Sequence, residues 1–233
     1  MRNFGLLFLL GLLISCFFVE KEEVTEKIIL KEYSVVLKSI KIERQSFQSK
    51  YKSANSIQKE VILKKAKKYL FKTLSKDIFP QWYGTAWDFN GTTRTPKKGK
   101  IACGYFVTNT LTDVGFNIPR IKWAQSASEV FIKKLAPTKD IVRFSNKPLA
   151  KVIAYFKKKG DGLYLVGLDS HTGFVVVNKD KINFVHANYY QREIGVMSED
   201  ISTKNPFGDS KYRVIGKLLS DKMVENWILN KRY

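Results

Sequence analysis

Three side chains in this sequence have the residue types of a nucleophilic catalytic centre. They are Cys103 and the only two histidines of the chain, His171 and His186. A free thiol is only slightly ionised at neutral pH, so a nucleophilic cysteine needs a neighbouring base or a local positive potential. A histidine can act as that base when another polar group orients its ring. The residue types therefore predict a cysteine nucleophile served by two histidines, provided that the fold brings them together.

The residues after Cys103 predict a helix that begins next to this cysteine. Apolar side chains recur at helical spacing from Gly104 to Val114, and Gly115 follows as a residue suited to end a helix. Cys103 is therefore expected at a helix N-terminus. Free backbone N–H groups and the helix dipole favour a thiolate there, and they can also hydrogen-bond a developing oxyanion.

The two histidines lie in a region whose pattern predicts antiparallel strands. Runs rich in β-branched and aromatic residues cover Leu163–Leu168, His171–Val177 and Lys181–His186, with turn residues between them. A hairpin between the second and third runs places His171 almost opposite His186. The alternative is that both histidines are half-exposed structural residues that lie near strand ends by chance.

Helices are expected ahead of these strands. Besides the helix at Cys103, helical spacing begins at Asn55, with Gln58 as its capping partner, and returns over Ser126–Leu135 and Pro148–Lys159. Helices followed by antiparallel strands are typical of an α+β domain. The sequence therefore predicts the α+β fold class.

An aromatic loop leads into the cysteine. Trp82 and Tyr83 belong to a segment rich in aromatic and turn residues that runs from Pro80 to Cys103. Such a loop next to a candidate nucleophile favours the wall of a cleft, so Trp82 and Tyr83 are predicted substrate-binding residues. The alternative is that these aromatic side chains only fill the core.

The N-terminal residues have the pattern of an export signal. Arg2 precedes an apolar run from Gly5 to Ile14, and Leu13-Ile14-Ser15-Cys16 resembles the lipobox of bacterial lipoproteins. The prediction is a signal peptide over residues 1–15 and a lipid on Cys16. The protein would then be exported and lipid-anchored to a bacterial cell-envelope membrane. An ordinary cleaved signal and a single membrane anchor remain as alternatives.

Residues 16–54 are predicted to be a lipidated tether and a poorly defined extension, with a strand over part of Glu32–Ile42. The folded domain is expected over residues 55–233. If Cys16 carries lipid, Cys103 has no cysteine left for an intramolecular disulfide. An unpaired cysteine in an exported protein is a buried inert residue, an intermolecular linker or a working thiol.

The chain is strongly basic, with 41 Lys and Arg against 21 Asp and Glu and a net charge of +20. This charge favours anionic partners such as membrane head groups, wall polymers or nucleic acid, but general lysine enrichment of a solvated surface explains it better. A nucleic-acid partner is not expected, because no recognition motif accompanies the charge. One Cys and two His without a set of carboxylates predict no metal site, and no cofactor is expected.

Four segments resemble, in order, the motif blocks of the NlpC-type cell-wall cysteine peptidases. They are Ile101–Val107, Gly160–Tyr164, His171–Val175 and Phe184–Tyr189, within a region of resemblance over residues 57–200. The resemblance implies a papain-like fold with N-terminal helices packed on an antiparallel sheet. It also implies that Cys103 is the nucleophile, His171 its base and His186 the orienting residue.

The chain departs from this family next to the cysteine. The family commonly has Asp before the cysteine and Ser after it, where this chain has Ala102 and Gly104. The missing Asp is the residue that holds the free amine of a peptidoglycan stem peptide, whereas Gly104 is expected to contact substrate. The leading hypothesis is an amide-bond hydrolase acting on peptide or peptidoglycan-like substrates, with acyl transfer to an amine as a variant. The alternative is a catalytically silent, lipid-anchored binding module, and the oligomeric state is left open.

Overall fold

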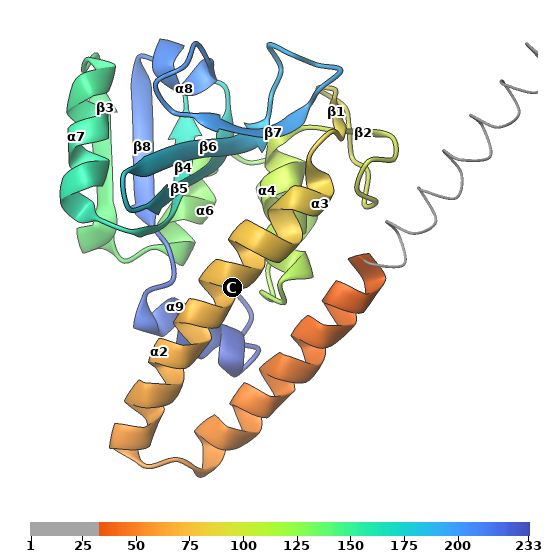
Figure 1. Cartoon of the computed structure of the whole chain (residues 1–233), viewed down its shortest axis with the longest axis vertical. Helices are drawn as coiled ribbons and strands as arrows, with labels where there is room; N and C mark the ends of the chain where they lie inside the picture. Colours follow the sequence, from red (N-terminus) through yellow and green to blue (C-terminus); the bar gives the residue numbers. More distant parts are fainter. Residues whose placement is uncertain (1–32) are drawn as a thin grey trace, which may run out of the picture.

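The computed structural model of the chain describes residues 33–233. The predicted signal peptide and the predicted lipidation site Cys16 lie outside the described residues. In the described part, helices cover an antiparallel sheet (Figure 1), and the predicted α+β class is confirmed.

The main sheet of residues 33–233 has six antiparallel strands in the order β3-β8-β4-β5-β6-β7. Their bounds are β3 Ile141–Ser145, β4 Gly162–Leu168, β5 Thr172–Asn178, β6 Lys181–Ala187, β7 Val196–Asp200 and β8 Tyr212–Lys217. Two short strands, β1 (Ala86–Trp87) and β2 (Lys100–Ile101), form a separate parallel pair. The three strands predicted around the two histidines are β4, β5 and β6, and they occupy consecutive places within the main sheet.

The helices include one over residues 33–53, which precedes the labelled helices. The others are α2 Ser56–Lys72, α3 Phe79–Trp82, α4 Cys103–Asp113, α5 Arg120–Ala124, α6 Ser128–Leu135, α7 Leu149–Lys159, α8 Pro206–Asp209 and α9 Asp221–Ile228. A π-helical segment, η1 (Thr73–Ile78), joins α2 to α3, and a short 3₁₀ turn, η2 (Thr138–Asp140), precedes β3.

The sheet separates two hydrophobic cores, because successive side chains of a strand point to opposite faces. In β4, Leu163 and Leu165 join the core that contains α2, α4 and α9. Tyr164 and Val166 join the core that contains α7 and α8. Burial on both faces explains why the central strands are almost uninterrupted apolar runs.

The N-terminal helix (residues 33–53) belongs to the first of these cores. Its buried side chains Tyr33, Ile40, Phe47 and Tyr51 recur at helical spacing and lie in one cluster with residues of α2, α4 and α9. The strand predicted over Glu32–Ile42 is therefore wrong, and residues 33–53 are a packed helix rather than a tether. A few alternating positions do not distinguish a strand from a helix, whereas the full 21-residue segment carries the helical period.

Aromatic contacts join the N-terminal helix to the rest of the domain. In Figure 1 it runs beside α2 as a helical hairpin that extends away from the sheet. The ring centroid of Phe47 lies 5.8 Å from Tyr69 of α2 and 6.0 Å from Trp227 of α9. The C-terminal helix therefore connects the hairpin to the body of the domain.

Most of the predicted helix boundaries are confirmed. The capping box at α2 has both of its reciprocal hydrogen bonds between Asn55 and Gln58. Gly115 follows α4 with φ +101°, a left-handed conformation that suits glycine. Helices α5, α8 and α9 and strands β3, β7 and β8 were not predicted.

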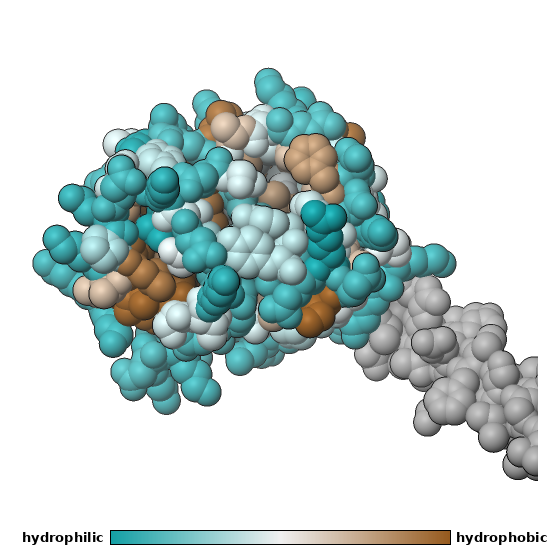
Figure 2. Space-filling view, turned by 90° about the horizontal axis from the view of Figure 1, so that it is seen from above, coloured by the Kyte–Doolittle hydropathy of each residue, from teal (hydrophilic) through white to brown (hydrophobic). Residues whose placement is uncertain are grey.

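The face seen in Figure 2 is largely hydrophilic with separate apolar patches. Among residues 33–233, no helix is long and apolar enough to span a bilayer.

Candidate active site

Helix α4 places Cys103 at the edge of a cleft. Cys103 is the first residue of α4, and its predecessor Ala102 is extended and offers no side-chain cap. The first N–H groups of a helix have no partner within the helix, so they are free to face the thiol or a bound group. Gly104 is buried against α5, because an added Cβ there would collide with the carbonyl oxygen of Ala124. The predicted position of the cysteine at a helix N-terminus is confirmed.

The hairpin of β5 and β6 brings the two histidines together. Nε2 of His171 lies 2.8 Å from Nδ1 of His186, within hydrogen-bond distance. The register of the strands places Gly173 opposite His186, since Phe174 pairs with Val185. A side chain at Gly173 would meet Cβ of His186 at 2.8 Å, so glycine leaves room for the histidine pair. The predicted juxtaposition of His171 and His186 is confirmed.

A third residue, Glu199 of β7, extends this pair. Its Oε1 lies 2.7 Å from Nε2 of His186. Phe184 pairs with Glu199 across β6 and β7, so Glu199 and His186 lie on the same face of the sheet. Sequence reasoning missed Glu199, because the acidic segment around it gave no strand pattern and the register of β7 is set only by pairing.

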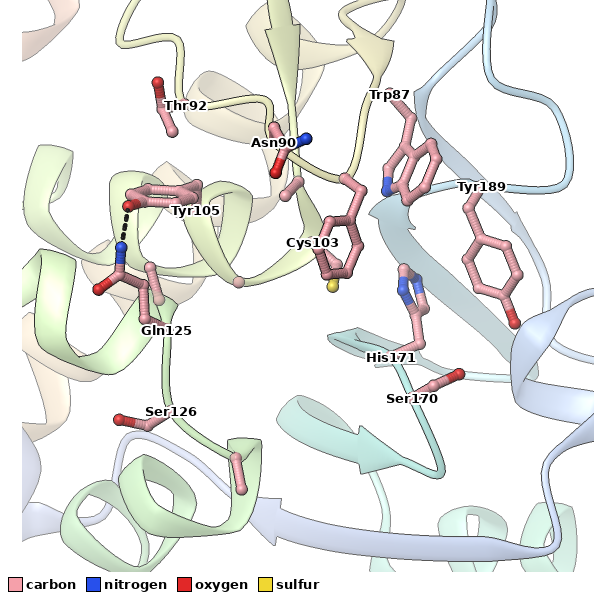
Figure 3. Close-up of a pocket in the computed structure, with 15 residues that line it drawn as sticks. Trp87, Asn90, Thr92, Cys103, Tyr105, Gln125, Ser126, Ser170, His171 and Tyr189 are labelled. Carbon is pink, nitrogen blue, oxygen red and sulfur yellow. Dashed lines mark hydrogen bonds between the residues drawn. The ribbon is translucent and has the colours of Figure 1, made fainter.

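The cleft beside Cys103 has a volume of about 740 Å³. Figure 3 shows the Cys103 sulfur on one wall and the His171 ring on the other, with Trp87 and Tyr189 on the same side as the histidine. None of the residues that line it carries a formal charge at neutral pH. They are Trp87, Phe89, Asn90, Thr92, Ala102, Cys103, Gly104, Tyr105, Ala124, Gln125, Ser126, Ala127, Ser170, His171 and Tyr189.

A second depression of about 490 Å³ adjoins the cleft, and both include Cys103, Gly104 and His171. It contains the acidic residues Glu129 and Asp169. Both carboxylates already have partners. Glu129 pairs with Arg143 at 2.6 Å, and Asp169 accepts backbone hydrogen bonds from the start of β8. The protein surface is therefore hollowed on both sides of the Cys103 thiol.

Burial favours the neutral forms of the candidate nucleophile and base. It raises the pKa of the Cys103 thiol, while the backbone N–H groups of Thr172, Gly104 and Cys103 act in the opposite direction. Burial and the neighbouring His186 hold the pKa of His171 well below its usual 6.5. Burial lowers the pKa of His186 to about 3. The backbone N–H groups of β5 and of the helix N-terminus therefore offset only part of the burial effect on the pKa of Cys103, where the sequence predicted a net lowering.

Trp87 lines the cleft, and its indole N–H is a buried hydrogen-bond donor without a partner. Its Nε1 is one of the buried side-chain polar atoms of the described chain that have no hydrogen-bond partner. Figure 3 shows the indole nitrogen on the edge of Trp87 that points toward His171. Buried donors in native structures are almost always paired, so this unpaired indole N–H at the wall of the cleft is an exception.

The predicted placement of Trp82 and Tyr83 in the wall of the Cys103 cleft is wrong. Trp82 is fully buried, and its Nε1 donates to the hydroxyl of Tyr33 at 2.9 Å, so it is a core residue. Tyr83 lines a different depression, together with Ser198 and Asn178. Of the three predicted substrate-binding residues, Gly104 alone lies in the cleft with Cys103. The aromatic residues that line the cleft are instead Trp87, Phe89, Tyr105 and Tyr189.

Within residues 33–233, no group of three or more His, Cys, Asp or Glu side chains is arranged to hold a metal ion. Cys103 and His171 line the same cleft, and hydrogen bonds link His171 to His186 and His186 to Glu199. Comparisons of the chain with models of protein families, with curated proteins and with solved structures find no match.

Proposed function

We propose that the protein is a cysteine hydrolase that cleaves an amide bond, with Cys103 as nucleophile and His171 as general base. The observation that carries this proposal is the alignment of side chains in one cleft. His171 and Cys103 line the same cleft, and Nε2 of His171 is occupied by His186 at 2.8 Å. Nδ1 of His171 is therefore the nitrogen left to serve the thiol.

In the proposed reaction, His171 takes the proton of Cys103 as the sulfur forms a bond to the substrate carbonyl carbon. The tetrahedral intermediate collapses when the carbon–nitrogen bond breaks and His171 returns the proton to the leaving amine. Water then attacks the thioester and His171 takes a proton from it, and His171 returns this proton to the Cys103 sulfur as the carbon–sulfur bond breaks. The products are a carboxylic acid and an amine, and the thiol is regenerated.

The negative charge that develops on the substrate carbonyl oxygen needs hydrogen-bond donors to stabilise it. The free N–H groups at the start of α4 supply one side of this site, because Cys103 is the first residue of the helix. The unpaired Nε1–H of Trp87 supplies the other. This assignment gives the buried indole donor a partner during the reaction.

The finer fold assignment is also part of the proposal. A helix that begins at the cysteine packs on the strands that carry the histidine pair, and α4 contacts β5 and β6. This arrangement supports the papain-like, NlpC-type fold implied by the motif resemblance. We further propose that the enzyme is exported, lipid-anchored through Cys16, and acts on peptides at the cell envelope.

Activated esters test the chemistry before the natural substrate is known. With p-nitrophenyl acetate, the full chain should release one equivalent of p-nitrophenolate in a burst and become acetylated on Cys103. Slower turnover should follow as the thioester is hydrolysed. Cys103→Ala should abolish the burst, and His171→Ala should slow it strongly.

Ser126→Ala is the matched control, because Ser126 lines the same cleft and its hydroxyl is occupied by the carbonyl oxygen of Lys122. This variant should keep the burst. No burst in the unaltered protein, or a burst that survives in Cys103→Ala, would contradict the hydrolase proposal. That result would favour the silent binding module instead.

A further inference from the structure

We infer that Glu199 is a positioning residue that sets the tautomers of both histidines and so leaves Nδ1 of His171 free to accept the Cys103 proton. The inference rests on the proposed function, because it assigns a role within the same proton path. It adds a fourth member to the three residues that the sequence motifs indicated.

Both carboxylate oxygens of Glu199 face donors. Asn188 Nδ2 lies 3.4 Å from Oε1, and the Thr203 hydroxyl lies 3.3 Å from Oε2 and shares its one hydrogen with the carbonyl oxygen of Asp200 at 2.8 Å. The Asn188 amide is oriented by its own oxygen, which accepts the backbone N–H of Tyr190 at 2.8 Å. Its nitrogen therefore faces Glu199. Burial raises the pKa of the Glu199 carboxyl, and the hydrogen bond from Thr203 acts in the opposite direction. The neighbouring donors favour the ionised form, which accepts hydrogen bonds and donates none.

The positions of the hydrogens on the two histidine rings follow from the Glu199 acceptor, beginning with the bond nearest to it. Nε2 of His186 lies 2.7 Å from Oε1 of Glu199 and must carry the hydrogen of that bond. Nδ1 of neutral His186 is then an acceptor, so Nε2 of His171 carries the hydrogen of the 2.8 Å bond between the rings. Nδ1 of His171 is left with a lone pair.

The opposite set of tautomers disables the base. If His186 carried its hydrogen on Nδ1, it would donate to Nε2 of His171. The hydrogen of neutral His171 would then lie on Nδ1, the nitrogen that must accept the thiol proton. An acceptor at Glu199 excludes this arrangement, which is how a carboxylate fixes the tautomer of a catalytic histidine.

The titratable groups that face the two rings come from few elements. Cys103 of α4 and Tyr189, which follows β6, face His171, and the Tyr189 ring centroid lies 5.1 Å away. On the other side, His186 of β6 faces Glu199 of β7. Among the described hydrogen bonds, the Glu199 carboxylate is thus the only group with a formal negative charge that bonds to the histidine pair. It also stabilises the positive charge that appears on His171 during proton transfer.

Nitrogen-15 NMR of histidine-labelled full chain reports this inference directly, since the chain has only two histidines. At pH 7.5 both rings should give a protonated Nε2 and an unprotonated Nδ1. Glu199→Ala should convert at least one ring to a mixture of tautomers and slow Cys103 acetylation by at least about tenfold. Glu199→Gln keeps a carbonyl acceptor, so it should retain the Nε2–H tautomers and lose less activity than Glu199→Ala.

Asp200→Asn is the matched control, because Asp200 is the next carboxylate of β7 and its side chain is held by Ser202. It should leave both spectra and rates unchanged. Unaltered tautomers in Glu199→Ala, or equal acetylation rates in Glu199→Ala and Glu199→Gln, would overturn the inference even if Cys103 is a working nucleophile. An acetylation burst absent from the unaltered chain would instead overturn the proposed function, and the tautomer spectra would still decide the role of Glu199.

Discussion

At the scale of single residues, the candidate site pairs a neutral thiol with a neutral imidazole. Burial raises the pKa of Cys103 and lowers that of His171, so both shifts disfavour a preformed thiolate–imidazolium pair. In the proposed reaction the proton therefore moves as the sulfur attacks, and the rate depends on how much His171 is neutral.

The lowered pKa of His171 predicts how the rate of Cys103 acetylation depends on pH. Because the pKa of His171 lies well below 6.5, the base stays neutral as pH falls from 8 to 6.5. We expect the rate of Cys103 acetylation to stay nearly constant over that range and to decline only at lower pH, as His171 becomes protonated. Stopped-flow release of p-nitrophenolate measures this profile.

The comparison variant is His171→Ala. Its remaining reaction needs free thiolate, so its rate should rise about tenfold per pH unit throughout the neutral range. An acid limb centred at or above pH 6.5 in the unaltered protein would contradict the burial of the base.

Trp87 gives a second prediction at this scale. Trp87→Phe keeps an aromatic ring in the cleft and removes the unpaired Nε1–H. We expect acetylation to slow by a factor on the order of 10², the usual effect of losing one oxyanion donor. Removing an unsatisfied buried donor should leave the free energy of unfolding unchanged or slightly higher.

The control is Phe89→Leu, which alters an exposed side chain of the same cleft and removes no donor. Its acetylation rate should stay within a few-fold of the unaltered protein. Equal rates in Trp87→Phe and the unaltered chain would remove Trp87 from the oxyanion site.

At the scale of elements, the start of α4 must approach α5 closely to hold the nucleophile in place. Gly104 allows this approach, and Gly104→Ala would force its Cβ against the carbonyl oxygen of Ala124. We expect a loss of about 1–3 kcal/mol in unfolding free energy, the usual cost of overpacking. The acetylation rate should also fall, because Cys103 is displaced. Urea unfolding and the ester burst measure the two effects.

Gly208→Ala provides the comparison, since its added Cβ would find only an ordinary contact with Leu149 at 3.6 Å. This variant should unfold near the urea concentration of the unaltered protein and keep its burst. A Gly104→Ala protein that behaves the same way would show that α4 and α5 can separate without cost.

At the scale of the whole molecule, two cores on opposite faces of the sheet hold the site, and the N-terminal helix contributes to one of them. Phe47 of that helix is buried between Tyr69 and Trp227. Phe47→Ala should therefore lower the unfolding free energy by about 3 kcal/mol, as for other large-to-small changes in a core.

The control on the same helix is Val35→Ala, because Val35 is 57% exposed. This change should cost no more than about 0.5 kcal/mol. If Phe47→Ala is equally mild, the helix over residues 33–53 is not an integral part of the domain. Denaturant unfolding followed by tryptophan fluorescence distinguishes these outcomes.

Local patterns in the sequence were sufficient to predict the elements that carry Cys103, His171 and His186. A helix beginning at Cys103 follows from apolar spacing and from Gly115, and the β5–β6 hairpin follows from period-two runs separated by short turns. These signals act between neighbours in the chain, so the pairing of His171 with His186 could be predicted from local sequence patterns.

The remaining features depend on contacts between distant segments. The burial of Trp82 depends on Tyr33, the position of Glu199 depends on the register of β7, and the cleft wall at Trp87 depends on a loop returning to the sheet. The protonation state of Cys103 also depends on the tertiary structure, because desolvation by the assembled cores outweighs the local effect of the helix N-terminus on its pKa. Sequence alone therefore determined which groups could react, and only the tertiary structure decided their neighbours, their protonation and the shape of the cleft.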